Sequence, residues 1–449
     1  MKDIVRIGNG QGFWGDSVDA PVNLAKDGPL DYLTLDYLAE VTLSIMQRQK
    51  LKNLNAGYAR DFIDMIRRIL PEIQENGLKV ITNAGGVNPQ ACREQLLKLS
   101  EDSGNTIKIG VIQGDDIFPE LQSIRSNGVS FDHMDSGQSF DEIADKVYSA
   151  NVYINSFTIS EALEKGAQIV LAGRVSDPGL ALGPCAYEFG WKNNDYDKIA
   201  AGTLAGHITE CGAQCTGGNF TNWKDVPDMA NLGYPIIEME ENGKFTITKH
   251  KDTGGLVNQE TITEQVLYEM GDPKNYISPD VCVDFTSFSL KDLGNDRVEV
   301  NDVKGSESTN TYKVSISYFA GYKASGQLTV SGPLAYEKAQ LTADIIWKRL
   351  KKAGCQFDDT STEYLGISSC HGDIKPVPKE INEVVLRLGV KDYDKDKVNR
   401  FGMEIAPVIT SGPPGVTGFS GGRPKAQDIV AYWPTLIPKQ LVKTTVDVL

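Results

Sequence analysis

The sequence lacks paired cysteines, dense basic runs and long apolar runs, and each absence excludes a class of protein. Its seven cysteines are odd in number and without a CxxC spacing, so we expect reduced thiols in the cytoplasm. The chain has 60 acidic and 45 basic residues, a net charge of −15, and no run of Lys and Arg dense enough to bind along a phosphate backbone. Nucleic acid is therefore not an expected partner. No stretch reaches the roughly 20 apolar residues of a membrane-spanning helix, so no membrane association is expected either.

The composition that remains is that of a globular protein. The chain has 449 residues, 40% of them hydrophobic, which is enough for two domains or for one domain with a large extension. Residues 1–8 have the pattern of a first strand and not of a signal peptide. We expect a cytoplasmic homo-oligomer that acts on a small molecule.

The first 280 residues alternate strand patterns with amphipathic helix patterns, which predicts an α/β core domain with a mostly parallel sheet flanked by helices. The run at 168–172 is almost wholly apolar, as in strands buried on both faces of a parallel sheet. We expect a helix after Leu35 with Leu38, Val41 and Ile45 on one face. The predicted strands are 4–8, 31–35, 79–82, 108–113 and 168–172, and the other predicted helices are 61–74, one opening at 88–89, one around 140–150 and 160–165.

From residue 281 the strands follow one another without helices between them, which favours antiparallel pairing. Residues 281–449 are therefore predicted to form a smaller α+β domain. Its loop 410–428 is rich in glycine and proline, and we expect it to dock, to act as a lid or to stay mobile, with Arg423 able to bring a cation to an anionic ligand. The predicted strands are 281–288, 297–301, 311–320 and 327–331, and the predicted helices are 334–352 and 379–388.

The richest candidate site is the segment 209–220, which follows His207. Glu210 lies three residues after His207, and a histidine held by a carboxylate suits proton transfer near neutral pH; a satisfied surface pair is the structural alternative. Cys211 is a candidate nucleophile with His207 as its base. Gln214 and Asn219 add amide groups for ligand binding. The spacing of His207, Cys211 and Cys215 suits zinc only on a continuous helix, which the glycines of this segment disfavour.

Two further candidate groups follow predicted strands. Arg174 is expected to bind a carboxylate or another oxyanion, with Asp177 as the acid that orients it, or else the two form a structural ion pair. Asp115 and Asp116 follow Gly114 and are alternative acids or bases, although aspartate after glycine is also ordinary turn chemistry. The carboxyl ends of such strands collect the ligand site in doubly wound sheets.

Glycine-rich turns supply candidate anion-binding amides. Gly10, Gly12 and Gly15 form a G-x-G-x-x-G pattern after the first strand, with Asp16 at its rim. The room before the next strand is too short for a normal dinucleotide-binding crossover helix, so a ligand-facing or structural turn is favoured over a nicotinamide site. A second such turn, after the third strand, contains Asn83, Gly85 and Gly86.

Several segments together resemble the acyclic terpene utilisation (AtuA) family, in order and context, over nearly the whole chain. The resemblance implies a cytoplasmic protein of branched terpenoid acid catabolism, where intermediates travel as coenzyme A thioesters beside biotin-dependent acyl-CoA carboxylases. The segments that carry it are 12–16, 35–40, 57–61, 82–86, 173–177, 210–214, 233–236, 254–257, 265–269, 271–273 and 433–434.

From these observations we expect a catabolic enzyme that acts on a branched acyl-CoA, a 3-hydroxyacyl thioester or the derived acid, by proton transfer of the hydratase, lyase or hydrolase kind. One alternative is a non-catalytic ligand-binding or assembly subunit that supports an acyl-CoA carboxylase or synthetase. Another is a metal-dependent hydrolase that uses His207, Cys211 and the aspartates. No cofactor is identified; a coenzyme A thioester enters as a candidate substrate.

Overall fold

The computed structural model describes residues 2–104, 106–374, 376–377, 380–418 and 421–449, which form two compact units. Unit 1 comprises the described residues within 1–317 and 432–449, and unit 2 comprises those within 318–431. The division falls within two long strands, β14 (Thr311–Ser331) and β17 (Gln427–Pro438). The boundary expected at 280 is thus displaced, because the strands that follow it pair with each other and pack on helix α9 (Tyr196–Thr209) of unit 1.

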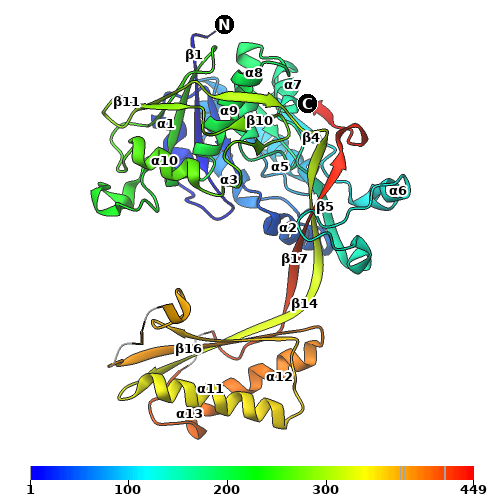
Figure 1. The fold of residues 1–449 in the computed structure, drawn as a ribbon. Coiled ribbons are helices and arrows are strands. Elements are labelled where there is room, and N and C mark those ends of the chain that lie inside the picture. The colour runs from blue at the N-terminus through cyan, green and yellow to red at the C-terminus, as the bar shows by residue number, and fades with distance from the viewer. Residues whose placement is uncertain (1, 105, 375, 378–379, 419–420) are drawn as a thin grey trace. The chain divides into compact units, whose positions relative to one another are not determined.

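A large mixed sheet forms the centre of unit 1 (Figure 1). Within the described residues it has ten strands in the order β11-β12-β8-β7-β1-β2-β3-β6-β4-β18. Strands β1, β2, β3, β6 and β4 are parallel, and the strands on either side of them pair antiparallel. The α/β prediction is therefore confirmed for this unit, with a parallel centre and antiparallel flanks. The bounds are β1 Ile4–Gln11, β2 Tyr32–Leu35, β3 Lys79–Thr82, β4 Ile109–Gln113, β6 Ile169–Leu171, β7 Pro235–Glu240, β8 Phe245–Lys249, β11 Ser289–Asp292, β12 Val298–Asn301 and β18 Thr445–Val448.

Helices cover both faces of this sheet. Side chains alternate along a strand, so Leu33 and Leu35 of β2 join the core beneath helices α1, α3 and α5, whereas Tyr32 faces the other way and its hydroxyl donates to Glu188 of α8. The sheet is therefore covered on both sides, as its parallel strands require. The helices are α1 Ala20–Asp27, α2 Glu40–Lys52, α3 Arg60–Arg68, α4 Leu70–Gln74, α5 Pro89–Asp102, α6 Leu121–Ser126, α7 Phe157–Glu164, α8 Gly179–Phe189, α9 and α10 Gln259–Leu267.

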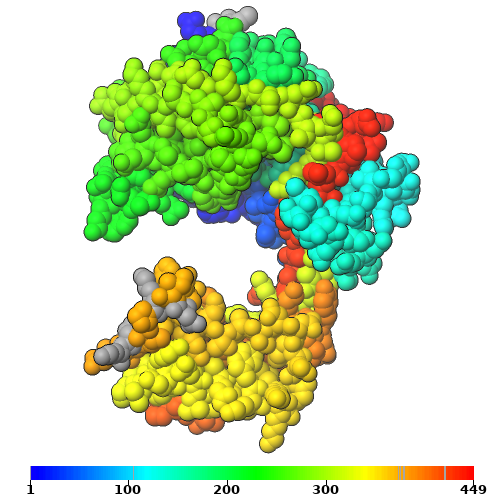
Figure 2. All heavy atoms as spheres, in the orientation of Figure 1, coloured from blue at the N-terminus to red at the C-terminus, as the bar shows by residue number. Residues whose placement is uncertain are grey.

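The last residues of the chain return to unit 1. In Figure 2 they appear in red beside the cyan residues that follow α6. The indole of Trp433 donates to the carbonyl of Phe131 at 2.9 Å, and β18 pairs with β4. A small antiparallel sheet of β9 (Tyr276–Ile277), β10 (Val281–Asp284) and β13 (Lys304–Glu307) completes this unit, and strand β5 (Val147–Val152) pairs with β14.

Unit 2 is an antiparallel sheet covered by helices, which confirms the α+β pattern. Strand β16 (Glu383–Asp392) pairs with both β15 (Asp359–Leu365) and β14. Helices α11 (Ala335–Lys352), α12 (Lys395–Ile405) and α13 (Val408–Ser411) share one hydrophobic core with this sheet.

Five predictions about single elements need correction. Residues 379–388 were expected to be helical, but 383–392 form β16, whose buried side chains alternate with a period of two. The expected helix at 140–150 is two short 3-10 turns followed by β5. The helix at 61–74 divides into α3 and α4, and α2 buries Leu43 and Met46 while Val41 is exposed. Strands 311–320 and 327–331 are one strand, β14. None of the described helices has the length and apolar character needed to cross a lipid bilayer.

Candidate functional site

A cavity of about 800 Å³ lies within unit 1, and we call it the main cavity. Its walls come from the carboxyl ends of β1, β2 and β6, the end of α9, the end of α10 and the start of β14. Carboxyl ends of parallel strands meet at one edge of a sheet, which is why segments far apart in sequence converge here. The lining includes Gly12, Phe13, Asp36, Leu38, Glu40, Met134, Tyr153, Arg174, Asp177, Glu210, Cys211, Gln214, Tyr268, Glu269, Tyr276, Ile277, Tyr312, Lys313 and Leu436.

Glu210 and His207 form a pair at the end of α9. Glu210 lines the main cavity with its side chain 12% exposed, whereas His207 is 1% exposed and lies behind it. The Nδ1 atom of His207 is 3.4 Å from Oε1 of Glu210, and its Nε2 atom is 3.3 Å from the carbonyl of Val266. The rings of Tyr276 and Phe285 pack against the imidazole. The side chain of Glu210, and not the imidazole of His207, therefore lines the main cavity.

Burial sets the proton affinity of this pair. Burial raises the pKa of Glu210 to about 7, although hydrogen bonding and the charge of His207 oppose the rise. Burial alone would lower the pKa of His207, but the hydrogen bond and charge of Glu210 outweigh it and raise that pKa. The second oxygen of Glu210, Oε2, has no hydrogen-bond partner among the described residues. A carboxyl with a pKa near neutral and a free oxygen suits a general acid–base group.

Arg174 and Asp177 form the structural ion pair that was the alternative to an oxyanion clamp. Nη1 of Arg174 lies 2.6 Å from Oδ1 of Asp177, and Nη2 lies 3.3 Å from Oδ2. Nη1 also donates to the carbonyl of Leu38, and the guanidinium stacks on the ring of Tyr153. Arg174 is 1% exposed, and most of its donors form hydrogen bonds within the protein. Its charge therefore neutralises Asp177 and not a ligand.

Other carboxyl groups make the main cavity acidic. Asp36 is buried at the end of β2 and accepts hydrogen bonds from Asn83 and from the amide of Leu38. Burial, reinforced by the charge of Asp177, raises the pKa of Asp36 well above its usual range. Glu40 accepts a 2.6 Å hydrogen bond from the hydroxyl of Tyr153. Among the described residues, five carboxyl groups and two cations line this cavity.

Cys211 lines the main cavity in an environment that disfavours the thiolate. Burial, together with the charges of Glu210 and Glu269, raises its pKa to about 12. His207 faces Glu210 and not this thiol, so the expected nucleophile–base pair does not form. Over the described residues, no three His, Cys, Asp or Glu side chains are grouped so as to hold a metal ion.

The glycine-rich turns are held by the chain itself. The amide of Gly12 donates to Asp16 at 3.0 Å, and the hydroxyl of Tyr234 donates to the same carboxylate at 2.7 Å. Gly12 also lies against the backbone of Cys211, where a Cβ atom would come within 2.7 Å of it. Gly10 packs against α1, and Gly15 has a φ of 107°.

The turn after β3 is likewise closed on itself. Asn83 is fully buried; its side chain accepts from the amide of Tyr37 and donates to Asp36. Gly85 packs on Pro89, and the amide of Gly86 donates to the carbonyl of Asn83. The amides of Gly12 and Gly86, which the sequence suggested for an anion, are thus used within the chain, and the two turns contact Cys211 and Asp36 instead.

The remaining predicted residues lie in three places. Asp115 is buried and accepts hydrogen bonds from the backbone amide of Arg174 and from the side chain of Asn151. It therefore holds the backbone at Arg174 and is not among the residues that line the main cavity. Asp116 is exposed beside it and is not among the residues that line the main cavity. Gln214 and Asn219 lie at or next to this cavity. Arg423 is exposed in unit 2.

Sequence reasoning missed several residues of the cavity. Asp36, Glu40, Tyr153, Glu269 and Lys313 were not proposed as site residues. Asp36 follows β2 directly and Glu40 begins the helix after it, so the rule that identified Arg174 at the end of β6 could have found them. Tyr153, Glu269 and Lys313 carry no local signal, because only the fold brings them to this cavity.

Three comparisons with known proteins bear on the identity of the chain. The model of one family, described as acyclic terpene utilisation family protein AtuA, matches residues 5–448. Neither a search of curated proteins nor a search of solved structures finds a match.

Proposed function

Because this match covers nearly the whole sequence, the chain belongs to the acyclic terpene utilisation family AtuA, and we propose that it is a catabolic enzyme of proton transfer on a branched acyl thioester. The family name indicates a role in acyclic terpene utilisation. The observation that carries the finer proposal is Glu210, a carboxyl with a pKa of about 7 and one unpaired oxygen on the wall of a large cavity.

The lining of the main cavity favours a branched apolar chain with a neutral head. Apolar side chains of Phe13, Leu38, Met134, Ile277 and Leu436 provide surface for such a chain.

The charges of the cavity favour a thioester over the free acid. Of the two cations in the lining, Arg174 is paired with Asp177, and Lys313 lies over the ring of Tyr153 with Nζ 3.9 Å from Glu40. A carboxylate would therefore meet unbalanced negative charge, which costs binding free energy. The neutral carbonyl of a thioester avoids that cost and also acidifies the neighbouring carbon.

We assign the two proton transfers of a dehydration to two carboxyl groups. Ionised Glu210 removes the proton from the carbon next to the thioester carbonyl, and His207 holds the resulting acid in place. The carbon–oxygen bond at the 3-position breaks, a carbon–carbon double bond forms, and protonated Asp36 supplies the proton with which the hydroxyl leaves as water. Hydration is the reverse. Two carboxyl groups in different environments are a common basis for such a division of roles.

Isotope exchange tests this proposal. Purified protein is incubated in D₂O with the coenzyme A thioester of a 3-hydroxy-3-methyl branched acid and with the corresponding 2-enoyl thioester. Mass spectrometry should show deuterium at the α-carbon together with loss or gain of water. Glu210→Gln should lower both rates by about 10²-fold or more, whereas Glu101→Gln, at an exposed glutamate of α5, should leave them unchanged. Absence of exchange and hydration with wild-type protein would refute the proposal and favour the assembly-subunit alternative.

A further inference from the structure

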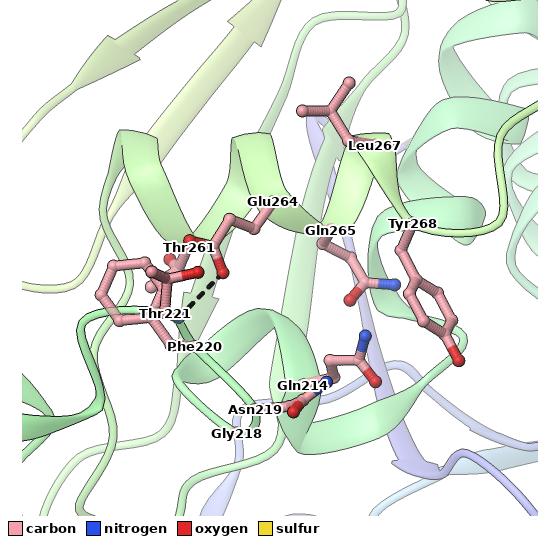
Figure 3. A pocket seen from close by; sticks show the side chains of 10 residues that line it. All are labelled: Gln214, Gly218, Asn219, Phe220, Thr221, Thr261, Glu264, Gln265, Leu267 and Tyr268. Atoms are coloured by element: carbon pink, nitrogen blue, oxygen red, sulfur yellow. Dashed lines mark hydrogen bonds between the residues drawn. The ribbon is translucent and has the colours of Figure 1, made fainter. Parts of the chain in front are cut away.

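A second, smaller pocket adjoins the main cavity, and we call it the side pocket (Figure 3). Its volume is about 340 Å³, within the range of known ligand sites. It lies between helix α10 and the segment that follows the 3-10 turn Gly212–Thr216. The lining residues are Gln214, Gly218, Asn219, Phe220, Thr221, Thr261, Glu264, Gln265, Leu267 and Tyr268.

Gln265 is the residue that suggests a ligand. It is 1% exposed, and neither Nε2 nor Oε1 makes a hydrogen bond of normal geometry among the described residues, although the thiol of Cys211 lies near enough for this amide to oppose the rise in its pKa. Its amide points toward that of Gln214 across the pocket (Figure 3). A buried amide without partners destabilises a fold by about 1–3 kcal/mol, and such groups in native proteins call for an explanation. A ligand that accepts from Nε2 and donates to Oε1 would supply the missing partners.

The side pocket and the main cavity share two lining residues, Gln214 and Tyr268. A single extended ligand can therefore reach both spaces. Gln214 lies in the 3-10 turn that follows Glu210 and Cys211, which places the side pocket next to the proposed acid–base group.

The chemistry of the lining selects a neutral amide. No lysine or arginine occurs among the described residues of this pocket, and its one carboxylate, Glu264, accepts from the amide of Thr221 at 3.0 Å. Phosphate and carboxylate groups would find no cation there. Amide and hydroxyl groups, which both donate and accept, dominate the polar lining, and a secondary amide offers the matching N–H and carbonyl.

We propose that the side pocket binds a secondary amide in the thiol arm of the substrate while the acyl group occupies the main cavity. This inference rests on the proposed function, because it assigns the position of the arm of the same thioester. Gln265 is then a specificity-determining residue that distinguishes an amide-bearing arm from a plain hydrocarbon.

A pair of matched thioesters tests the proposal. Isothermal titration calorimetry compares the N-acetylcysteamine thioester and the S-pentyl thioester of 3-methylbut-2-enoic acid, which differ in that an amide replaces two methylene groups. With wild-type protein the amide-bearing ligand should bind at least tenfold more tightly, as two hydrogen bonds of ordinary strength would give. Gln265→Leu should bring the ratio of the two dissociation constants near one, and Gln259→Leu, at an exposed glutamine of the same helix, should preserve it.

The outcomes separate this inference from the proposed function. Equal binding of the two thioesters to wild-type protein overturns the side-pocket proposal without the help of any variant. If that equal binding comes with deuterium exchange at the α-carbon, the acid–base function survives alone. A clear preference for the amide without exchange supports the side pocket and refutes the chemistry assigned to Glu210. If neither thioester binds, both proposals fail.

Discussion

Replacing Glu210 by glutamine should stabilise the folded protein at alkaline pH while it removes the proposed acid–base group. Folding raises the pKa of this carboxyl from 4.5 to about 7. Between these two values the unfolded chain is ionised but the folded chain is protonated, so the contribution of Glu210 to stability falls as the pH rises through this range. Above pH 7 this rise in pKa lowers the free energy of unfolding by about 3 kcal/mol, compared with a carboxyl group whose pKa does not change on folding. Glutamine is neutral at every pH and can still donate to Nδ1 of His207.

His207 acts in the same direction. Its pKa is raised in the folded state, so its stabilising contribution is present below its ordinary value of 6.5 and is lost as the pH rises through the folded value. Without the carboxylate of Glu210, burial would instead favour the neutral imidazole. The substitution therefore removes the pH dependence of Glu210 and reverses that of His207, and both changes make the difference between variant and wild type grow with pH.

Thermal unfolding measures this difference. At pH 8 the Glu210→Gln protein should melt about 5 °C above wild type, since about 3 kcal/mol corresponds to a shift of this order in a large domain. At pH 5 the two melting temperatures should be much closer. Glu101→Gln supplies the control for a charge change at an exposed site. A difference that is the same at pH 5 and pH 8, or a variant that melts below wild type at pH 8, would refute the reasoning.

Three further predictions concern neighbouring groups. Arg174→Ala should lower the free energy of unfolding by about 3–5 kcal/mol, because it leaves Asp177 without its buried partner; a loss below about 1 kcal/mol in a urea titration would contradict this. Gly12→Ala should cost about 1–3 kcal/mol in the same titration, since a Cβ atom would lie 2.7 Å from the backbone of Cys211, and an unchanged midpoint would show that the turn relaxes freely. Cys211, with its pKa raised to about 12, should react slowly with iodoacetamide at pH 8, and exposed Cys370 should react first; peptide mass spectrometry that finds Cys211 labelled first would overturn the assigned environment.

Local patterns predicted most of unit 1. The apolar run at β6 and the helix start at Pro89 depend on periodicity and on helix-start chemistry, which act within a few residues. Strand β16 shows where such interpretation failed, because residues 379–388 were predicted to be a helix, whereas buried Val384, Leu386, Leu388 and Val390 alternate with less buried residues along a strand. This period of two is clear in the burial of the side chains but weak in the sequence, where apolar Val385 interrupts it; pairing within a sheet that has one covered face outweighs helix propensity here.

The candidate site was predictable only in part. Glu210 and His207 lie three apart on one helix, so their proximity follows from local geometry. The free amides expected at Gly12 and Gly86 were not found, because the chain supplies its own acceptors to both. Nothing in the sequence tells whether an amide will meet a ligand or a neighbouring residue, since that depends on atoms brought together by folding.

Sequence patterns alone were sufficient to predict the family, the α/β class, and the segments from which polar groups reach the site. The folded structure was needed to show that Arg174 neutralises Asp177, that Glu210 and not His207 lines the main cavity, and that Gln265 is buried without a hydrogen bond of normal geometry. The reason is that residue type and spacing act over one helical turn or one strand. Burial and charge, which set the pKa of Glu210 and the pairing of Arg174, depend instead on side chains from strands and helices far apart in the sequence.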